Sequence, residues 1–231
     1  MTYCISDIHG EYEKFVEMLE LIQLGGDDTL YIIGDVFDRG EHPVKTLQKI
    51  MDMPNVRFII GNHELMAMEC FKLDLNQLSS IDDITDYDTI EKLMTWAHNG
   101  SKTTMNEYGK LTTEERHRVR DYLENALAYE QLEIGGQKFL LVHSGLMNFD
   151  PGRDISDYEL YELVWERPDY SKPYFDDVIT VTGHTPTQLI EGCDTPGRIF
   201  KKNNHIVIDC GAVMGGSLAC LRLDDMKEFY V

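Results

Sequence analysis

The sequence predicts an α/β fold in which a largely parallel sheet packs against a second set of strands, with a helical insertion between them in the chain. Three observations indicate this arrangement. Strand-like and helix-like segments alternate over the first third of the chain, the middle is polar and helical in character, and short strand-like segments fill the rest. Alternating β and α segments are typical of parallel sheets with right-handed crossovers.

The first third contains three units, each a short apolar strand followed by a helix. The predicted strands are "TYCIS", "TLYII" and "VRFII", and the predicted helices cover residues 13–24, 44–53 and a segment from Leu65 onward. Phe15, Leu19 and Ile22 recur at helical spacing in the first helix. Pro43 suits the first turn of the second helix, because its fixed φ matches the helix and its missing N–H is not needed there.

The segment from about Lys72 to Ala128 interrupts this alternation. It is polar and helix-like, and we expect a helical insertion within a single domain spanning residues 1–231. We expect this insertion to lie over the strand ends, where loops usually carry specificity. The strand-like runs after it are "EQLEI", "KFLLVHSG", "VITVTGH", "HIVIDCG" and "SLACLRL".

Composition excludes several classes of partner. The formal net charge of −20 disfavours a nucleic-acid backbone or an anionic membrane surface as partner. The longest apolar runs are too short to span a bilayer. The strand-like "TYCIS" begins at Thr2, and we expect no signal peptide and a cytoplasmic protein. The five cysteines include no CxxC pair, which argues against a zinc knuckle or a disulfide framework.

Polar side chains follow five of the predicted strands, at the point where each strand ends. They are Asp7 and His9, then Asp35, Asp38 and Arg39, then Asn62 and His63, then His143, and finally His184. The crevice outside the carboxyl ends of the strands is where open α/β sheets bind ligands. A single histidine at a strand end is usually structural, but five polar clusters in order predict a functional site.

The composition of this set predicts two metal ions. Asp35 could bridge them, with Asp7 and His9 on one ion and Asn62, His143 and His184 on the other. Nitrogen and oxygen donors without thiolate suit manganese, iron or zinc better than calcium or copper. Two adjacent ions form a clamp for in-line displacement at phosphorus. Two divalent ions, two carboxylates and a bridging hydroxide leave about one net positive charge to attract a phosphate.

Within "GNHE", two further side chains have simple local explanations. Gly61 is expected to permit the tight turn between the strand and the helix. Glu64 is expected to favour the positive end of the following helix. Neither residue is assigned to the metal site.

The motifs "DIHG", "GDVFDRG", "GNHE", "VHSG" and "GHTP", in that order, resemble the phosphoprotein phosphatase family of calcineurin-like metallophosphatases. The segments "WAHNGSKTTMNEYG" and "IDCGAVMGGSLACL" resemble parts of the bacterial members, so the resemblance covers nearly the whole chain. The family's fold implies a central β-sandwich of two mixed sheets flanked by helices in four layers.

The resemblance also implies roles for the matching residues. The metal ligands of the family match Asp7, His9, Asp35, Asn62, His143 and His184. The family's general acid matches His63, and the carboxylate that orients this acid matches Asp38. The family's phosphate-binding arginine matches Arg39. Arg167 in "LVWERPDY" is the candidate for a second phosphate-binding arginine, with a surface salt bridge as the alternative. The implied cofactors are two divalent transition-metal ions, with manganese favoured and iron or zinc as alternatives.

The activity implied by the resemblance is metal-dependent phosphomonoester hydrolysis by a bacterial-type Ser/Thr protein phosphatase. A hydroxide that bridges the two ions would attack phosphorus in line. Phosphoproteins or phosphopeptides are the expected substrates, with phosphotyrosine as a further substrate and small aryl phosphates in vitro.

Two other functions remain open. The first is a diadenosine tetraphosphate hydrolase of a related group, in which the "DRG" aspartate is typically replaced and "GNHE" typically ends in Asp. Asp38 and Glu64 therefore favour the protein phosphatase. The second is an inactive scaffold that binds phosphoproteins, against which the intact His63, Asp38 and Arg39 argue because a scaffold needs no general acid.

Overall fold

The computed structural model describes residues 1–71 and 87–231, which contain two five-stranded sheets packed face to face. The first sheet has the strand order β10-β9-β1-β2-β3 and the second β4-β5-β6-β8-β7. The strands of the first sheet are β1 (Thr2–Ile5), β2 (Thr29–Ile33), β3 (Val56–Ile59), β9 (Ala219–Arg222) and β10 (Lys227–Tyr230). The second contains β4 (Tyr129–Ile134), β5 (Gln137–Val142), β6 (Val178–Thr182), β7 (Phe200–Lys202) and β8 (His205–Val207).

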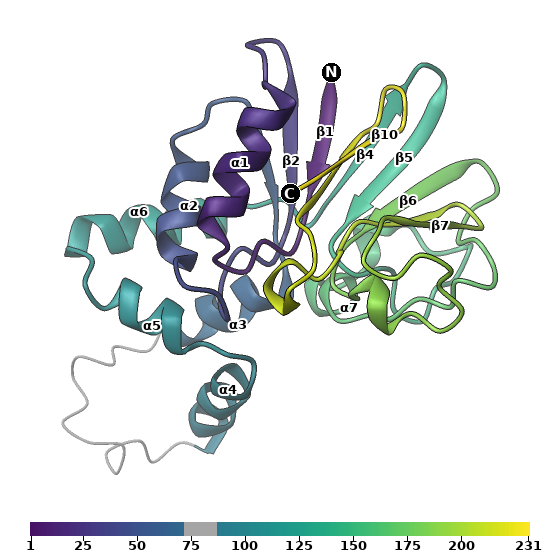
Figure 1. Ribbon diagram of the computed structural model, residues 1–231. Helices are drawn as coiled ribbons and strands as arrows, with labels where there is room; N and C mark the ends of the chain where they lie inside the picture. Colours follow the sequence, from purple (N-terminus) through teal and green to yellow (C-terminus); the bar gives the residue numbers. More distant parts are fainter. Residues whose placement is uncertain (72–86) are drawn as a thin grey trace.

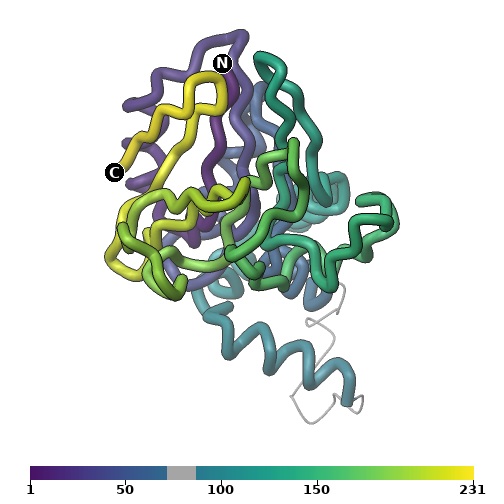
Figure 2. The backbone as a smooth tube through the Cα atoms, turned by 90° about the vertical axis from the view of Figure 1, so that its right-hand side faces the viewer, coloured from purple at the N-terminus to yellow at the C-terminus, as the bar shows by residue number. Residues whose placement is uncertain are grey.

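Both sheets are mixed, which confirms the predicted sandwich. In the first sheet β1, β2 and β3 run parallel, and β9 joins β1 in the antiparallel direction. In the second sheet β5, β6 and β8 run parallel, whereas β4 and β7 are antiparallel edge strands. Figure 2 shows the C-terminal hairpin of β9 and β10 beside the N-terminal strand.

Helices cover the outer side of the first sheet (Figure 1). The α-helices are α1 (Tyr12–Ile22), α2 (Pro43–Met51), α3 (Asn62–Phe71), α4 (Tyr87–His98), α5 (Lys102–Tyr108), α6 (Thr113–Glu124) and α7 (Leu160–Val164). Short 3-10 helices are η2 (Ile155–Asp157), η3 (Thr187–Leu189) and η4 (Ala212–Met214). None of the helices in the described ranges is long and apolar enough to cross a membrane.

Alternate residues of the first sheet face opposite layers. Tyr3 and Ile5 pack in the cluster formed with the helices, whereas Cys4 packs in the cluster between the two sheets. Successive side chains of a strand point to opposite faces, so a strand buried on both faces is apolar throughout. This is why "TYCIS" and "TLYII" read as continuous apolar runs. The outer face of the second sheet is covered by η2, α7 and nearby loops, with Leu140 and Val142 packed against Ile155 and Leu163.

The insertion is helical where the structure describes it. Residues 72–86 of the predicted segment lie outside the described residues, and α4, α5 and α6 follow them. The start of α6 is fixed by a capping box, in which Thr112 and Glu115 each accept a hydrogen bond from the other's backbone N–H. Figure 1 places α4 and α5 below the lower ends of β1 and β2, which are the carboxyl ends of these strands.

Candidate metal centre

The carboxyl ends of β1, β2, β3, β5 and β6 bring the predicted side chains to one place between the two sheets. Asn62, which begins α3 directly after β3, joins the sheets. Its Oδ1 lies 3.0 Å from Nε2 of His143 and 2.9 Å from Nδ1 of His184, which follow β5 and β6. His143 is fully buried and Asn62 nearly so, so this contact belongs to the interior rather than to a surface loop.

Asp35 lies at the centre of the site. Its Oδ2 is 3.6 Å from Nε2 of His9 and 3.9 Å from Nε2 of His63, and its Oδ1 is 3.4 Å from Nε2 of His143. Two ligand atoms on one ion, each bound at about 2.1 Å, lie no more than about 4.2 Å apart. In two triads of described residues, His9–Asp35–His63 and Asp35–His143–His184, the ligand atoms lie within 4.8 Å of one another, and Asp35 belongs to both. We propose that Asp35 bridges two ions.

Backbone carbonyls set the tautomer of two of these histidines. His9 Nδ1 lies 2.7 Å from the carbonyl oxygen of Phe37, and His143 Nδ1 lies 2.9 Å from that of Ile33. A carbonyl can only accept a hydrogen bond, so Nδ1 carries the proton and Nε2 is left as the metal-binding atom. Both Nε2 atoms face Asp35. The residues therefore fit a metal centre of nitrogen and oxygen donors.

Asp7 occupies the edge of this cluster. Its two carboxylate oxygens accept the backbone N–H of His184 at 3.0 and 3.1 Å, which ties the end of β1 to the second sheet. A Cβ at Gly183 would lie only 2.0 Å from Oδ2 of Asp7, so only glycine fits there. Neither triad contains Asp7, and its assignment as a ligand stays a prediction.

His63 and Asp38 form a buried pair beside the centre. His63 Nδ1 lies 2.7 Å from Oδ2 of Asp38, and both side chains are inaccessible to solvent. The guanidinium of Arg39 lies 2.9 Å from Nε2 of His63 and 2.8 Å from Nε2 of His9. The 2.7 Å contact would let Asp38 orient the imidazole, and this role stays a prediction. Because His63 also belongs to a metal-compatible triad, spacing does not distinguish an acid from a ligand.

The buried charges perturb the histidines in opposite directions. Burial and the neighbouring His63 hold the pKa of His9 well below its usual range, and burial and His143 lower the pKa of His184 to about 3. Burial opposes a charge on His143, but the carboxylates of Asp35 and Asp7 outweigh it and raise its pKa to about 10. Metal ligation requires a neutral imidazole, so ion binding at His143 would displace a proton.

The loops that carry the site have unusual backbone geometry. Of the ten predicted site residues, six have φ values between 46° and 69°: Asp7, His9, Asp35, Asp38, Arg39 and His184. This left-handed region is uncommon for residues other than glycine and costs roughly 1–3 kcal/mol per residue. Such conformations cluster at functional sites, where the surrounding structure holds them in place.

Glu64 has a structural role that sequence reasoning missed. Its carboxylate is fully buried and accepts four backbone N–H groups, from Asp35 and Val36 at 2.8 Å and from Phe37 and Gly61 at 3.0 Å. It therefore fixes the loop after β2 that presents Asp35, besides standing in the first turn of α3. The motif "GNHE" offers no local signal for these partners, since three of them lie 27 to 29 residues away.

Glycine is needed at position 61 for a reason that differs from the predicted one. Its φ is outside the left-handed region, so the turn itself does not demand glycine. A Cβ at this position would lie 2.2 Å from Oδ1 of Asp35. Gly61 is required by the close approach of the central carboxylate.

Glu64→Gln is expected to destabilise the protein by about 2–4 kcal/mol, because an NH2 group would face two buried N–H donors. Looser placement of Asp35 should also weaken metal binding. Urea unfolding with chelator present measures the first effect, and a manganese titration the second. Glu107→Gln is a matched control, since Glu107 also accepts backbone N–H groups, at Val44 and Lys45, but away from the site. Equal metal affinity in both variants would contradict this role.

Two residues of the insertion contact Asp38, and neither was predicted. Trp96 Nε1 of α4 donates to Oδ2 of Asp38 at 2.8 Å, and Thr104 Oγ1 of α5 donates to Oδ1 at 2.5 Å. The backbone N–H of Arg39 donates to the carbonyl of Gly100 between these helices. The described part of the insertion therefore lies against the site and supports the carboxylate that orients His63.

Thr104→Val is expected to lower kcat about 10–100-fold, the usual effect of losing a group that supports a catalytic side chain. The loss should be larger for a poor leaving group, because Asp38 acts through His63, and metal content should not change. Thr103→Val is the matched control, since Thr103 Oγ1 is buried without a hydrogen-bond partner in the described part of the chain. Similar kinetics for the two variants would show that Thr104 does not position Asp38.

Asp209 is a further buried carboxylate close to the centre. It follows β8, is 4% exposed, and accepts the backbone N–H of Gly211 at 2.9 Å. Burial, opposed by that hydrogen bond and reinforced by the charge of Asp35, raises its pKa to about 6. The criterion of a polar residue at a strand end, applied to "HIVIDCG", would have found it.

Arg167 lies beside the ligand candidates of the second sheet rather than at the centre. Its Nη1 donates to Oγ1 of Thr185, the residue after His184, at 3.5 Å. It forms no ion pair with any residue in the described ranges, so the surface salt bridge considered as an alternative is not seen there. Its exposed guanidinium stays a candidate for binding phosphate.

Comparisons with known proteins agree with this geometry. The family model described as calcineurin-like phosphoesterase matches residues 2–211. A curated relative is the asymmetrical bis(5'-nucleosyl)-tetraphosphatase PrpE of Geobacillus sp. (strain WCH70), 26% identical over 98% of this chain and 92% of the relative.

Two solved structures show the same fold. A putative diadenosine tetraphosphatase superposes with a TM-score of 0.66 and 16% identity, covering all of this chain and 92% of the other. A protein serine/threonine phosphatase from Saccharomyces cerevisiae superposes with a TM-score of 0.57 and 15% identity, covering all of this chain and 78% of the other. The match of the family model over most of the chain, on a sandwich whose strand ends carry these ligand candidates, shows that the protein belongs to the calcineurin-like phosphoesterase family.

Proposed function

We propose that the protein hydrolyses a phosphoanhydride bond of a dinucleoside polyphosphate, such as diadenosine tetraphosphate. The observation that carries this proposal is the full-length relationship to a bis(5'-nucleosyl)-tetraphosphatase, which covers 98% of the chain. Water supplies the oxygen that bonds to phosphorus, the P–O–P bond breaks, and a nucleotide leaves. The products distinguish symmetrical cleavage, which gives two ADP, from asymmetrical cleavage, which gives AMP and ATP.

The arrangement of the side chains supports phosphoryl chemistry of this kind. Two divalent ions held by the Asp35 triads would neutralise phosphate charge and lower the pKa of water at the site. Arg39, within 3 Å of two imidazoles at the centre, is placed to hold phosphate oxygens. His63, oriented by Asp38, is placed to give a proton to the leaving oxygen.

The burial of Glu64 weakens one of the two sequence arguments for a protein phosphatase over a diadenosine tetraphosphate hydrolase. Glu64 and Asp38 were the two positions that favoured a protein phosphatase over a diadenosine tetraphosphate hydrolase. Glu64 is fully buried and contacts backbone N–H groups of the loop that presents Asp35. Since a buried group of this kind does not touch substrate, its identity carries little information about which phosphate ester is cleaved.

A Ser/Thr protein phosphatase is the second candidate, and Asp38 favours it. The 2.7 Å contact between Asp38 and His63 helps the imidazole to act as an acid. A serine alkoxide is a poor leaving group that needs a proton, whereas a nucleotide leaves as a stable anion. The intact pair also argues against an inactive scaffold.

A hydrolysis panel tests the proposal. The manganese-loaded protein is assayed with diadenosine tetraphosphate, a phosphoserine peptide, a phosphotyrosine peptide and p-nitrophenyl phosphate, and the nucleotide products are separated. We expect kcat/KM for diadenosine tetraphosphate to exceed that for either peptide by at least about tenfold, which is about 1.4 kcal/mol of transition-state stabilisation. Asp35→Asn protein purified in the same way controls for contaminating hydrolases. The reverse preference would identify a protein phosphatase, and no hydrolysis of any substrate would identify a scaffold.

A further inference from the structure

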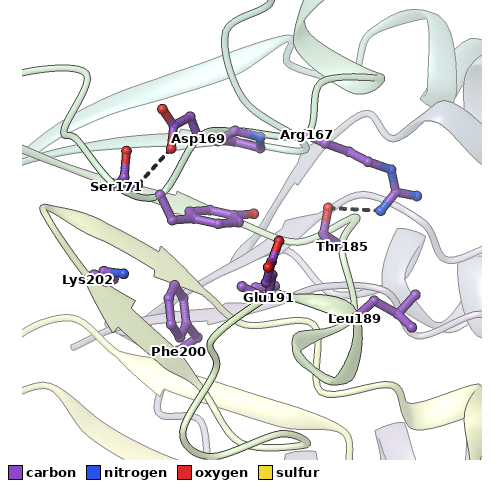
Figure 3. A pocket seen from close by; sticks show the side chains of 11 residues that line it. Arg167, Asp169, Ser171, Thr185, Leu189, Glu191, Phe200 and Lys202 are labelled. Atoms are coloured by element: carbon purple, nitrogen blue, oxygen red, sulfur yellow. Dashed lines mark hydrogen bonds between the residues drawn. The ribbon is translucent and has the colours of Figure 1, made fainter.

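A pocket of about 360 Å³ opens directly beside the metal centre. It lies between the loop that follows α7 and the segment that follows β6, with β7 on its far side (Figure 3). Thr185, which lines it, follows the ligand candidate His184 and receives the hydrogen bond from Arg167. Its volume falls at the small end of the 300–1,000 Å³ typical of pockets for small molecules.

Part of the pocket wall is aromatic and apolar. The ring of Tyr170 packs edge-on against Phe200, with 5.4 Å between centroids and 72° between planes. Leu189 and Ile190 line another side, and Leu189 is 61% exposed although it is large and apolar. Rigid aromatic walls beside polar and charged side chains suit a flat heterocycle that also forms hydrogen bonds.

The charges around the pocket balance. Two cations, Arg167 and Lys202, and two anions, Asp169 and Glu191, line it. Figure 3 shows Arg167 with Thr185 on one side of the pocket, Lys202 with Phe200 on the other, and Glu191 pointing between them. A pocket without net charge would not attract a further polyphosphate group. It suits a neutral group whose hydroxyl and amino hydrogens can be accepted by the carboxylates.

We propose that this pocket binds one nucleoside of a dinucleoside polyphosphate, with Arg167 contacting the phosphate chain where it leaves the metal centre. This inference rests on the proposed function and adds the residues that would recognise the nucleoside. The base packs against Tyr170 and Phe200, and Leu189 covers its edge. Glu191 and Asp169 accept hydrogen bonds from the ribose or the base, and Lys202 donates one to a ring nitrogen of the base.

The experiment compares two ligands that share a diphosphate and differ in the nucleoside. ADP and methyl diphosphate are titrated separately into the full-length, manganese-loaded protein by calorimetry. ADP is expected to bind at least about tenfold more tightly, about 1.4 kcal/mol. Leu189→Asp and Lys202→Ala should each remove most of this preference. The matched controls are Leu21→Asp, at an exposed leucine of α1, and Lys201→Ala, at the neighbouring lysine that pairs with Glu228 instead.

Each outcome has a distinct meaning. Equal affinity for ADP and methyl diphosphate in the unchanged protein, or a preference that survives in both pocket variants, would overturn the nucleoside site. A higher KM for the phosphoserine peptide in Leu189→Asp, with the ADP preference intact, would assign the pocket to a peptide and also overturn it. The ADP preference does not require hydrolysis of diadenosine tetraphosphate, so failure of the proposed function is recognised separately by the hydrolysis panel.

Discussion

Asp35→Asn is expected to abolish hydrolysis and to release both metal ions from the protein. Asp35 lies within 3.4 to 3.9 Å of the Nε2 atoms of three histidines and belongs to both triads. An amide has one neutral oxygen and cannot bridge two cations as a carboxylate does. The loss of kcat/KM should reach at least about 10³-fold, more than the 10–100-fold that removal of a supporting group typically costs.

Elemental analysis and kinetics on the same preparations check this prediction. The unchanged protein should hold close to two transition-metal ions per chain, and chelation should abolish its activity. Asp7→Asn should retain one ion because Asp7 is assigned to only one, and the exposed Asp52→Asn should retain both. Thermal melts with chelator present separate loss of metal from loss of folding. An Asp35→Asn protein that keeps two ions and most of its activity would refute the bridging role.

His63→Asn is expected to slow hydrolysis according to how much the leaving group needs a proton. General acid catalysis typically contributes about 10²–10⁴-fold, or roughly 3–5 kcal/mol. A phosphoserine peptide should lose a factor in that range, because an alkoxide must be protonated. p-Nitrophenyl phosphate should lose much less, since its phenolate is stable as an anion. Diadenosine tetraphosphate should resemble p-nitrophenyl phosphate, because a nucleotide also leaves as a stable anion.

Metal content decides between the two roles that the geometry allows for His63. His63 Nε2 lies 3.9 Å from Asp35, close enough to share an ion, while its Nδ1 contacts Asp38. If His63 is the acid, His63→Asn keeps both ions, and Asp38→Asn shows the same substrate dependence more weakly. Equal slowing of all substrates with loss of an ion would make His63 a ligand and would contradict the assignment.

Much of the fold could be predicted because its elements have local signatures. The alternation of apolar strands with amphipathic helices gives β1 to β3 and α1 to α3, and Pro43 does occupy the first turn of α2. The strands β7 and β10 were not predicted. β7 has three residues, and β10, "KEFY", has little apolar character, so neither carries a pattern of its own. Both are edge strands held by hydrogen bonds to one neighbour, β8 and β9 respectively.

The positions of polar residues at strand ends were enough to predict which side chains gather at the candidate site. Asp35, Asn62, His143 and the other ligand candidates stand at strand ends, and the parallel strands of each sheet bring such ends to one edge of that sheet. The hydrogen bonds that hold those residues in place could be found only from the tertiary structure. Glu64 holds the loop of Asp35, and Trp96 and Thr104 hold Asp38 from 58 and 66 residues away. The periodicity of apolar residues predicts which face of an element is buried, but it does not predict which distant donor forms a hydrogen bond with which acceptor. That pairing depends on how the insertion and the two sheets pack together.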